Sequence, residues 1–225
     1  MKNPFSRALA AALLAILCVV PLAAQTSTIG TDTNGNAAIR YMQTDPSCTL
    51  HNGTVSGTGV AVAETCGMLG YDHVSYFTVT GLVITVTDAT TAGAHGSQKI
   101  YTWPLGSIFS KGCSFNLTTT AGSGGIADTA ALVGSLGTVT TATDNATLTS
   151  TEADLIASFA GTLSGGTGVL QKNDGPVTTE YDGTVTAEDI WLNVAVPDAG
   201  SSASDTLTVS GTIVCRWEWL PDPTP

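Results

Sequence analysis

The histidines and cysteines of this chain are the residues best suited to catalysis or metal binding. It has 225 residues, with three histidines and five cysteines. A hydrolytic triad needs a base beside its nucleophile and a third group that orients the base. His73 follows Asp72 directly, but neighbouring residues on a strand point to opposite faces, so Asp72 would not orient the His73 ring. The sequence also has no Gly-x-Ser-x-Gly elbow. We therefore expect a protein that is not an enzyme.

The cysteines favour disulfides over a metal site. Cys48, His51, Cys66 and His73 are ligand types that zinc prefers, but their spacing matches no common zinc finger. Outside the leader described below, the remaining cysteines are even in number, which in an exported chain indicates two disulfides with three possible pairings. We expect Cys48 to pair with Cys66, since both lie in one short segment. Cys113 and Cys215 should pair with each other, since both lie in predicted core strands.

Two further patterns suggest ligands only weakly. The acid pairs Glu180 with Asp182 and Glu188 with Asp189 could bind calcium, but no Asp-x-Asp-x-Asp-Gly loop accompanies them, and solvated surface acids are the favoured interpretation. The segment 122–127 resembles a dinucleotide fingerprint, but it lies among threonines with strand character, which predicts an ordinary loop. We expect no cofactor and no bound metal.

The tryptophans could form a platform for a sugar or a partner. Trp103, Trp217 and Trp219 are expected in the core, because buried aromatic side chains dominate the cores of β domains. Trp191 is out of phase with the apolar face of its strand, so it is the candidate for a partner contact.

The composition requires a folded chain and excludes several classes. The chain is 43% hydrophobic and 11% charged, with a formal charge of −11. It is too apolar to be disordered, and it lacks the charged helix formers of a coiled coil. Its acidic excess argues against nucleic acid as a partner.

The N-terminus predicts export. Lys2 and Arg7 precede an apolar run over 8–20, followed by Pro21 and the small residues Ala23 and Ala24. This pattern predicts a secretory signal peptide over 1–24 and no membrane contact in the mature form. The expected location is periplasmic or extracellular.

The rest of the chain divides into an arm, a β domain and a tail. Residues 25–70 are rich in Gly, Thr and Asn and should form an N-terminal arm with one short hairpin, with turn signals at 34–35 and 52–53. Residues 71–220 carry the strand signals, and 221–225 form a Pro-rich tail. One short helix is expected near 149–157, where Thr149 and Glu152 could form a capping box.

Three local patterns predict how the strands are built. The alternation of apolar residues slips in phase at Gly81, which indicates a bulge. Asp182 and Gly183 separate two strand patterns and predict a two-residue hairpin. In the last strand, Leu207, Val209, Ile213, Cys215, Trp217 and Trp219 share one face. Many short strands and frequent turns predict an all-β, antiparallel β-sandwich or jelly-roll-like fold.

Over residues 77–217, a series of segments in order resembles tailed-phage virion proteins. The segments are 77–89, 103–106, 137–140, 148–152, 162–166, 182–187 with 192–193, and 209–213. The resemblance implies a structural, head-associated protein that self-associates or contacts other virion proteins, located in the virion. A leader peptide and inward cysteines depart from that pattern. The alternative is an exported bacterial adhesin-like or ligand-binding β-sandwich with an acidic surface.

Overall fold

The computed structural model describes twelve parts of the chain and two separate units. The described residues are 27–31, 37–41, 53–67, 72–90, 93–122, 126, 130–141, 148–164, 166–173, 179–183, 186–197 and 205–220. The chain divides into a unit of Met1–Gln43 and a unit of Thr44–Pro225. The predicted signal peptide 1–24 and the tail 221–225 lie outside the described residues.

The first unit contains the hairpin that was expected in the arm. Strand β1 (Ser27–Thr31) pairs antiparallel with β2 (Ala37–Tyr41), and Ile29 lies opposite Ile39. The turn signal at 34–35 lies between these two strands.

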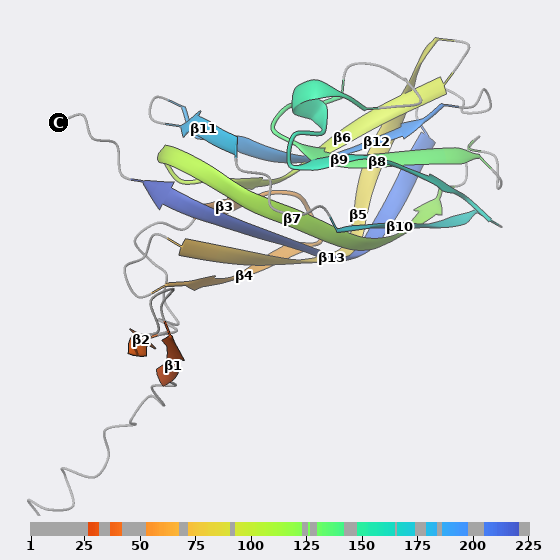
Figure 1. Ribbon diagram of the computed structural model, residues 1–225. Helices are drawn as coiled ribbons and strands as arrows, with labels where there is room; N and C mark the ends of the chain where they lie inside the picture. The colour runs from red at the N-terminus through yellow and green to blue at the C-terminus, as the bar shows by residue number, and fades with distance from the viewer. Residues whose placement is uncertain are drawn as a thin grey trace, which may run out of the picture. The chain divides into compact units, whose positions relative to one another are not determined.

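The second unit is an antiparallel β-sandwich, which confirms the expected fold class (Figure 1). Its first layer has the strand order β10-β7-β13-β5, with β4 added beside β5 and β11 beside β7. Its second layer contains β6, β12, β8 and β9 in that order, with β3 beside β6. The first-layer strands are β4 (Val60–Cys66), β5 (Asp72–Thr90), β7 (Gly106–Ala121), β10 (Thr167–Asn173), β11 (Thr179–Gly183) and β13 (Asp205–Leu220). Those of the second layer are β3 (Thr54–Val55), β6 (Gly93–Thr102), β8 (Ala131–Gly137), β9 (Ile156–Thr162) and β12 (Asp189–Val196).

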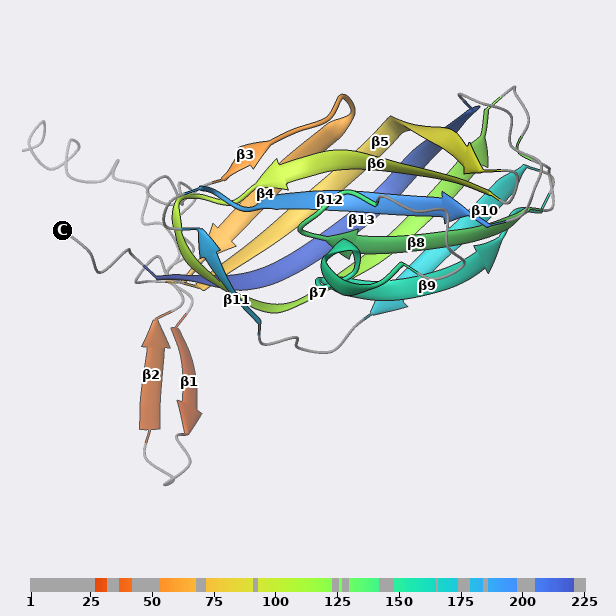
Figure 2. The ribbon, with the colours of Figure 1, turned by 90° about the horizontal axis from the view of Figure 1, so that it is seen from above.

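Strand β5 is shared between the two layers. Residues 72–86 of β5 pair with β13 in the first layer, and Thr87 and Asp88 pair with β6 in the second. Figure 2 shows β5 crossing beneath β6 on its way from one layer to the other.

The bulge predicted at Gly81 is confirmed. Gly81 has φ +63, a conformation that glycine adopts without the steric cost of a Cβ atom. The register between β5 and β13 shifts between Val209 and Gly211, and the Gly81 N–H donates to Ser210 Oγ at 2.9 Å. Because of the bulge, Phe77 and Val79 before it and Leu82 and Ile84 after it all point into the core.

The predicted phase of the last strand is also confirmed. Leu207, Val209, Ile213, Cys215 and Trp217 are buried, Trp219 is half-buried, and the residues between them face outward. These side chains meet the inward residues of β5, β6, β7 and β12 in one hydrophobic core.

The hairpin predicted at Asp182-Gly183 is wrong. Strand β11 pairs with β7, with Gly183 opposite Gly106, whereas β12 pairs with β6 and β8 in the other layer. Neither Asp182 nor Gly183 has the positive φ that a type I′ turn requires. The segment after Gly183 therefore carries the chain between layers.

Two other boundaries need correction. The helix expected over 149–157 is a single 3₁₀ turn, η1 (Ser150–Glu152); the Thr149 N–H donates to Glu152 Oε2 at 3.4 Å, and Ile156 already begins β9. Strands β3 and β4 lie within the sequence assigned to the N-terminal arm, but they pair with β6 and β5. The sandwich therefore begins before residue 71.

Candidate functional site

The outer face of the first layer carries regular rows of threonines. Thr120 lies opposite Thr167 of β10 and Thr208 of β13, and Thr212 lies opposite Thr78 of β5. Residues directly opposite one another in antiparallel strands present their side chains on the same face. Ten outward threonines are exposed or half-buried: Thr78, Thr80, Thr85, Thr87, Thr118, Thr120, Thr167, Thr206, Thr208 and Thr212.

This part of the sheet contains no charged residue. We call it the uncharged face, and it comprises 76–87 of β5, 114–120 of β7, 167–171 of β10 and 206–214 of β13. Its exposed apolar side chains include Tyr76, Val83 and Val169, which are 46%, 52% and 55% exposed. A chain with a formal charge of −11 thus leaves a broad surface without charge.

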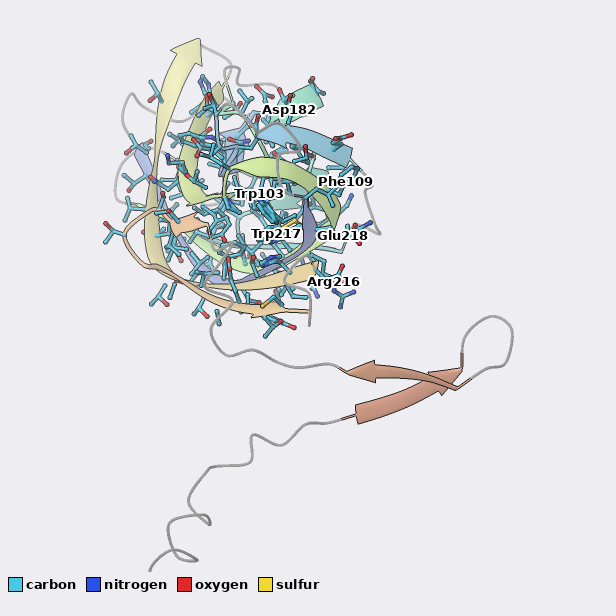
Figure 3. The ribbon with its side chains drawn as sticks, turned by 90° about the vertical axis from the view of Figure 1, so that its left-hand side faces the viewer. Trp103, Phe109, Asp182, Arg216, Trp217 and Glu218 are labelled. Atoms are coloured by element: carbon cyan, nitrogen blue, oxygen red, sulfur yellow. A yellow bond between two sulfur atoms is a disulfide. The ribbon has the colours of Figure 1, made fainter. Side chains whose placement is uncertain are left out.

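The exposed charges of the first layer lie at its other end, whereas the half-buried Lys172 and the buried Asp205 border the uncharged face. One cross-strand row runs from Glu180 of β11 through Phe109 of β7 and Glu218 of β13 to Asp72 of β5. Glu218 also forms an ion pair with Lys111 at 3.0 Å. In Figure 3, Phe109, Arg216 and Glu218 lie at this end of the layer, while Trp103 and Trp217 lie inside the sandwich.

A shallow groove of about 200 Å³ opens on the uncharged face and its margin. Gln171 of β10 lies opposite Asn116 of β7, which lies opposite Thr212 of β13. All three side chains are exposed. The residues lining the groove are Ser114, Phe115, Asn116, Gln171, Lys172, Thr212 and Val214.

Tyr76 lies beside this groove. Val214, which lines the groove, is directly opposite Tyr76, and Ala63 of β4 is on the other side of Tyr76. The small Ala63 side chain leaves the phenol ring exposed. An aromatic ring and two amides therefore lie on one surface formed by four strands.

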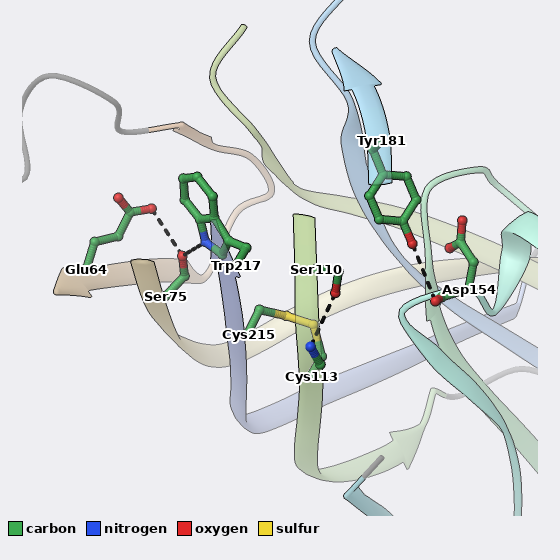
Figure 4. Close-up of a disulfide and its surroundings, with 9 residues drawn as sticks. Glu64, Ser75, Ser110, Cys113, Asp154, Tyr181, Cys215 and Trp217 are labelled. Carbon is green, nitrogen blue, oxygen red and sulfur yellow. Dashed lines mark hydrogen bonds between the residues drawn. A yellow bond between two sulfur atoms is a disulfide. The ribbon is translucent and has the colours of Figure 1, made fainter. Parts of the chain in front are cut away.

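Inside the sandwich, the buried Ser75 and Tyr101 form a hydrogen-bond network with the half-buried Glu64. Ser75 donates to Glu64 Oε1 at 3.3 Å and accepts from Trp217 Nε1 at 2.9 Å (Figure 4). Tyr101 donates to the same Glu64 oxygen and accepts from the Gly53 N–H. Burial raises the pKa of Glu64, an effect larger than the opposing hydrogen bonds from Tyr101 and Ser75. Because Ser75 is fully buried, this network holds strands together rather than meeting a substrate.

His73, whose ring Asp72 was not expected to orient, is also buried. His73 is 2% exposed and stacks on Trp217 with ring centroids 4.0 Å apart, whereas Asp72 is exposed. The two side chains therefore face opposite sides of β5, as the alternation predicted.

Several acids from different loops and strands lie near one another. Burial raises the pKa of Glu188, and the negative charges of Asp154, Asp189 and Asp182 raise it further. Asp154 accepts from the Thr138 N–H at 2.9 Å and from Thr138 Oγ1 at 2.7 Å. The acid pairs identified in the sequence did not include Asp154, because its loop is far from them along the chain. Within the described residues, no group of three or more His, Cys, Asp or Glu side chains is arranged to bind a metal.

The predicted pairing of Cys113 with Cys215 is confirmed. Cys113 of β7 and Cys215 of β13 form a disulfide, and both are buried (Figure 4). Cys66 is also disulfide-bonded, which makes it unavailable as a zinc thiolate. Its expected partner Cys48, and the candidate zinc ligand His51, lie outside the described residues.

Two of the three tryptophans expected in the core are there: Trp103 and Trp217 are each 1% exposed. Trp219 is half-buried at the edge of the core and donates to the Leu105 carbonyl at 2.8 Å. Trp191 is half-buried on the outward side of β12, opposite Lys99 and Gly137. Its role as a partner contact stays a prediction.

The uncharged face was only partly visible in the sequence. Alternation with Phe77 and Phe115 identifies Tyr76 and Asn116 as outward, and this signal could have marked them as candidates. Their proximity depends on β13 lying between β5 and β7, which no local pattern indicates.

Comparisons with known proteins show little similarity. No family model and no curated protein matches the sequence. One matching solved structure comes from work described as "Structural basis for the promiscuous specificity of the carbohydrate-binding modules from the beta-sandwich super family". The match has 14% identity and a TM-score of 0.21, and it covers 82% of this chain and 70% of that chain. A likeness at this level carries no argument about function, and the resemblance to virion proteins stays a prediction.

Proposed function

We propose that this chain is an exported, non-catalytic binding protein that acts through its uncharged face. The observation that carries the proposal is the separation of charge within one layer. The exposed acids and bases of this layer gather at the end formed by β11 and the ends of β7 and β13, while the uncharged face holds threonine, valine and amide side chains.

An uncharged face is suited to binding because removing water from charged groups is costly. Burying a charge without a partner is expensive, whereas hydroxyl and amide groups can exchange water for hydrogen bonds with a ligand. The centres of binding interfaces are accordingly depleted of charged residues. The negative charge elsewhere in the chain would keep copies of the protein apart in solution.

Export is supported by the N-terminal pattern and by the disulfides. Disulfides persist in oxidising compartments, and Cys113–Cys215 joins two central strands of the first layer. In the described part of the chain, no helix has the length and apolar character needed to cross a bilayer.

The proposal is tested by placing a charge in the middle of the face. Residues 25–225 would be incubated with insoluble neutral polysaccharides, peptidoglycan, lipid vesicles and immobilised copies of the same protein, and the retained fraction measured. Thr118→Lys replaces an exposed β7 residue that lies between Val169 and Ser210. Thr162→Lys is the matched control, because it is an exposed threonine of β9 in the second layer.

We expect retention on at least one material, a loss of about tenfold or more with Thr118→Lys, and wild-type retention with Thr162→Lys. Circular dichroism would show that both variants are folded. Retention on none of the materials, or equal losses in both variants, would overturn the proposal.

A further inference from the structure

We infer that the groove and the adjoining Tyr76 bind a short neutral saccharide that runs across β10, β7, β13 and β5. This inference rests on the proposed function, because it names the ligand of the same uncharged face. It is carried by the side chains that the strand register brings together.

The groove matches hydroxyl groups in its hydrogen-bonding chemistry. Asn116 and Gln171 lie directly opposite each other, and each amide offers two donor hydrogens and an acceptor oxygen. Thr212 and Ser114 add hydroxyls that both donate and accept. Sugar hydroxyls also do both, so neighbouring hydroxyls of one ring can bond to neighbouring amides without leaving a polar group unsatisfied.

The charges around the groove favour a neutral sugar. Among the described residues that line it, Lys172 is the one with a charge, and none is a carboxylate that could hold an amine or a divalent cation. The formal charge of −11 on the whole chain repels polyanions such as uronic acid polymers and nucleic acids. The exposed Asn116, Gln171 and Thr212 side chains favour a ligand with hydroxyl groups over a wholly apolar small molecule, whose sites are lined mainly by hydrophobic side chains.

Tyr76 supplies the apolar contact that a sugar ring needs. Its ring is exposed, and it lies one strand beyond Val214, which lines the groove. Aromatic rings offer a large, rigid face that packs against apolar C–H groups, while the phenol oxygen remains available for a hydrogen bond.

The spacing of the strands sets the direction and length of the ligand. Neighbouring strands are about 4.8 Å apart and residues along a strand about 3.4 Å, so Asn116 of β7 and Tyr76 of β5 are separated by about 10 Å across the strands and by two residues, about 7 Å, along them. A saccharide with one ring at the amides and another on Tyr76 would therefore cross the strands obliquely.

The experiment is calorimetric titration of residues 25–225 with defined oligosaccharides. The neutral probes are oligomers of glucose, mannose, xylose and N-acetylglucosamine with two to six rings, and the charged probes are oligogalacturonates of equal length. The variants are Asn116→Ala, Gln171→Ala, Tyr76→Ala, Tyr76→Phe and Lys172→Ala. Thr162→Ala is the control on the other layer.

We expect at least one neutral series to bind, with affinity rising from two to three rings. Asn116→Ala and Gln171→Ala should each weaken binding about tenfold, because a ligand hydroxyl loses its partner. Tyr76→Ala should weaken binding about fivefold to tenfold, and Tyr76→Phe less than Tyr76→Ala, because the phenyl ring retains the stacking surface. Thr162→Ala should leave binding unchanged.

Other results would overturn the inference. If no neutral oligosaccharide binds while Thr118→Lys still abolishes retention on another material, the inference fails and the proposed function stands. Tighter binding of oligogalacturonates that depends on Lys172 would replace the neutral ligand by an acidic one. Equal affinities for Tyr76→Ala, Asn116→Ala and Thr162→Ala would place the sugar elsewhere on the protein.

Discussion

Cys113 and Cys215 lie directly opposite each other on β7 and β13, with their Cα atoms 4.1 Å apart. They join positions 102 residues apart in the sequence, so the crosslink closes a long loop of the unfolded chain. On the same two strands, Ser114 and Val214 of the groove are the next opposed pair, and Asn116 and Thr212 are three positions along from the disulfide. The disulfide therefore lies behind the surface that we propose binds ligand.

Removal of this disulfide should destabilise the sandwich strongly. In the chain-entropy model, a crosslink that closes a loop of about 100 residues contributes about 4.7 kcal/mol to the free energy of unfolding at 25 °C. We expect Cys113→Ala with Cys215→Ala to lower the free energy of unfolding by about 4 to 5 kcal/mol. Guanidinium denaturation, compared with wild type, measures the change. A loss below about 1 kcal/mol would show that β7 and β13 are held in place without the crosslink.

Removal of the Tyr101 hydroxyl should lower the free energy of unfolding although it takes away a single oxygen atom with its hydrogen. Tyr101 is fully buried, accepts from the Gly53 N–H at 2.8 Å and donates to Glu64. Tyr101→Phe leaves the Gly53 N–H without its hydroxyl partner and takes one of two donors from Glu64 Oε1, which keeps Ser75, so we expect a loss of about 1 to 3 kcal/mol. The matched control is Tyr76→Phe at an exposed tyrosine, where we expect a change within about 0.5 kcal/mol. Equal changes in the two variants, measured by urea denaturation, would contradict the structural role of Tyr101.

Burial of Glu64 should make stability depend on pH. Its pKa in the folded state is raised above the ordinary value of 4.5, so the folded protein binds this proton more tightly than the unfolded chain does. The contribution is therefore fully present below pH 4.5 and is lost as pH rises through the raised pKa of the folded state. In Glu64→Gln the decrease in stability over this range should be smaller than in wild type. Denaturation midpoints measured from pH 4 to pH 8 test this, and identical pH profiles would contradict it.

Asn193 should fix the segment that covers the outer side of β12. The fully buried Asn193 side chain donates to the carbonyls of Val139 at 2.9 Å and Glu152 at 2.8 Å, and accepts from Ser97 Oγ at 2.6 Å. Asn193→Ala leaves these groups without their amide partner, and we expect a loss of about 2 to 4 kcal/mol and faster amide exchange in 138–141 and 148–155. Unchanged exchange at Thr138 and Thr141 would contradict this role.

Trp191 provides a test of which layer binds the ligand. It lies on the outward side of β12 in the second layer, away from the uncharged face. Under our proposal, Trp191→Ala leaves saccharide affinity unchanged, and a loss of fivefold or more would instead support the partner contact predicted from the sequence.

Local patterns predicted the parts of the fold that depend on neighbouring residues. The phase slip at Gly81 and the inward row ending at Trp217 follow from period-two alternation, which each strand carries by itself. The Asp182-Gly183 hairpin was predicted wrongly because β11 pairs with β7, which lies far earlier in the chain, so tertiary pairing overrode the turn signal. The capping box at Thr149 and Glu152 was identified correctly, but strand pairing of β9 with β8 takes over at Ile156 and limits η1 to one turn.

The candidate site was less accessible to sequence reasoning. Its residues come from β10, β7, β13 and β5, which are adjacent in the sheet but separated in the chain. Alternation indicates that Asn116, Gln171 and Tyr76 point outward, but only the register places Gln171 opposite Asn116 and Tyr76 opposite Val214.

The path of β5 has a mechanical consequence for the whole sandwich. Because this one strand is hydrogen-bonded first to β13 and then to β6, the sheets share a continuous backbone and cannot shear past each other without stretching it. The two layers should consequently unfold together in a single cooperative transition, so that a substitution that destabilises one layer also destabilises the other.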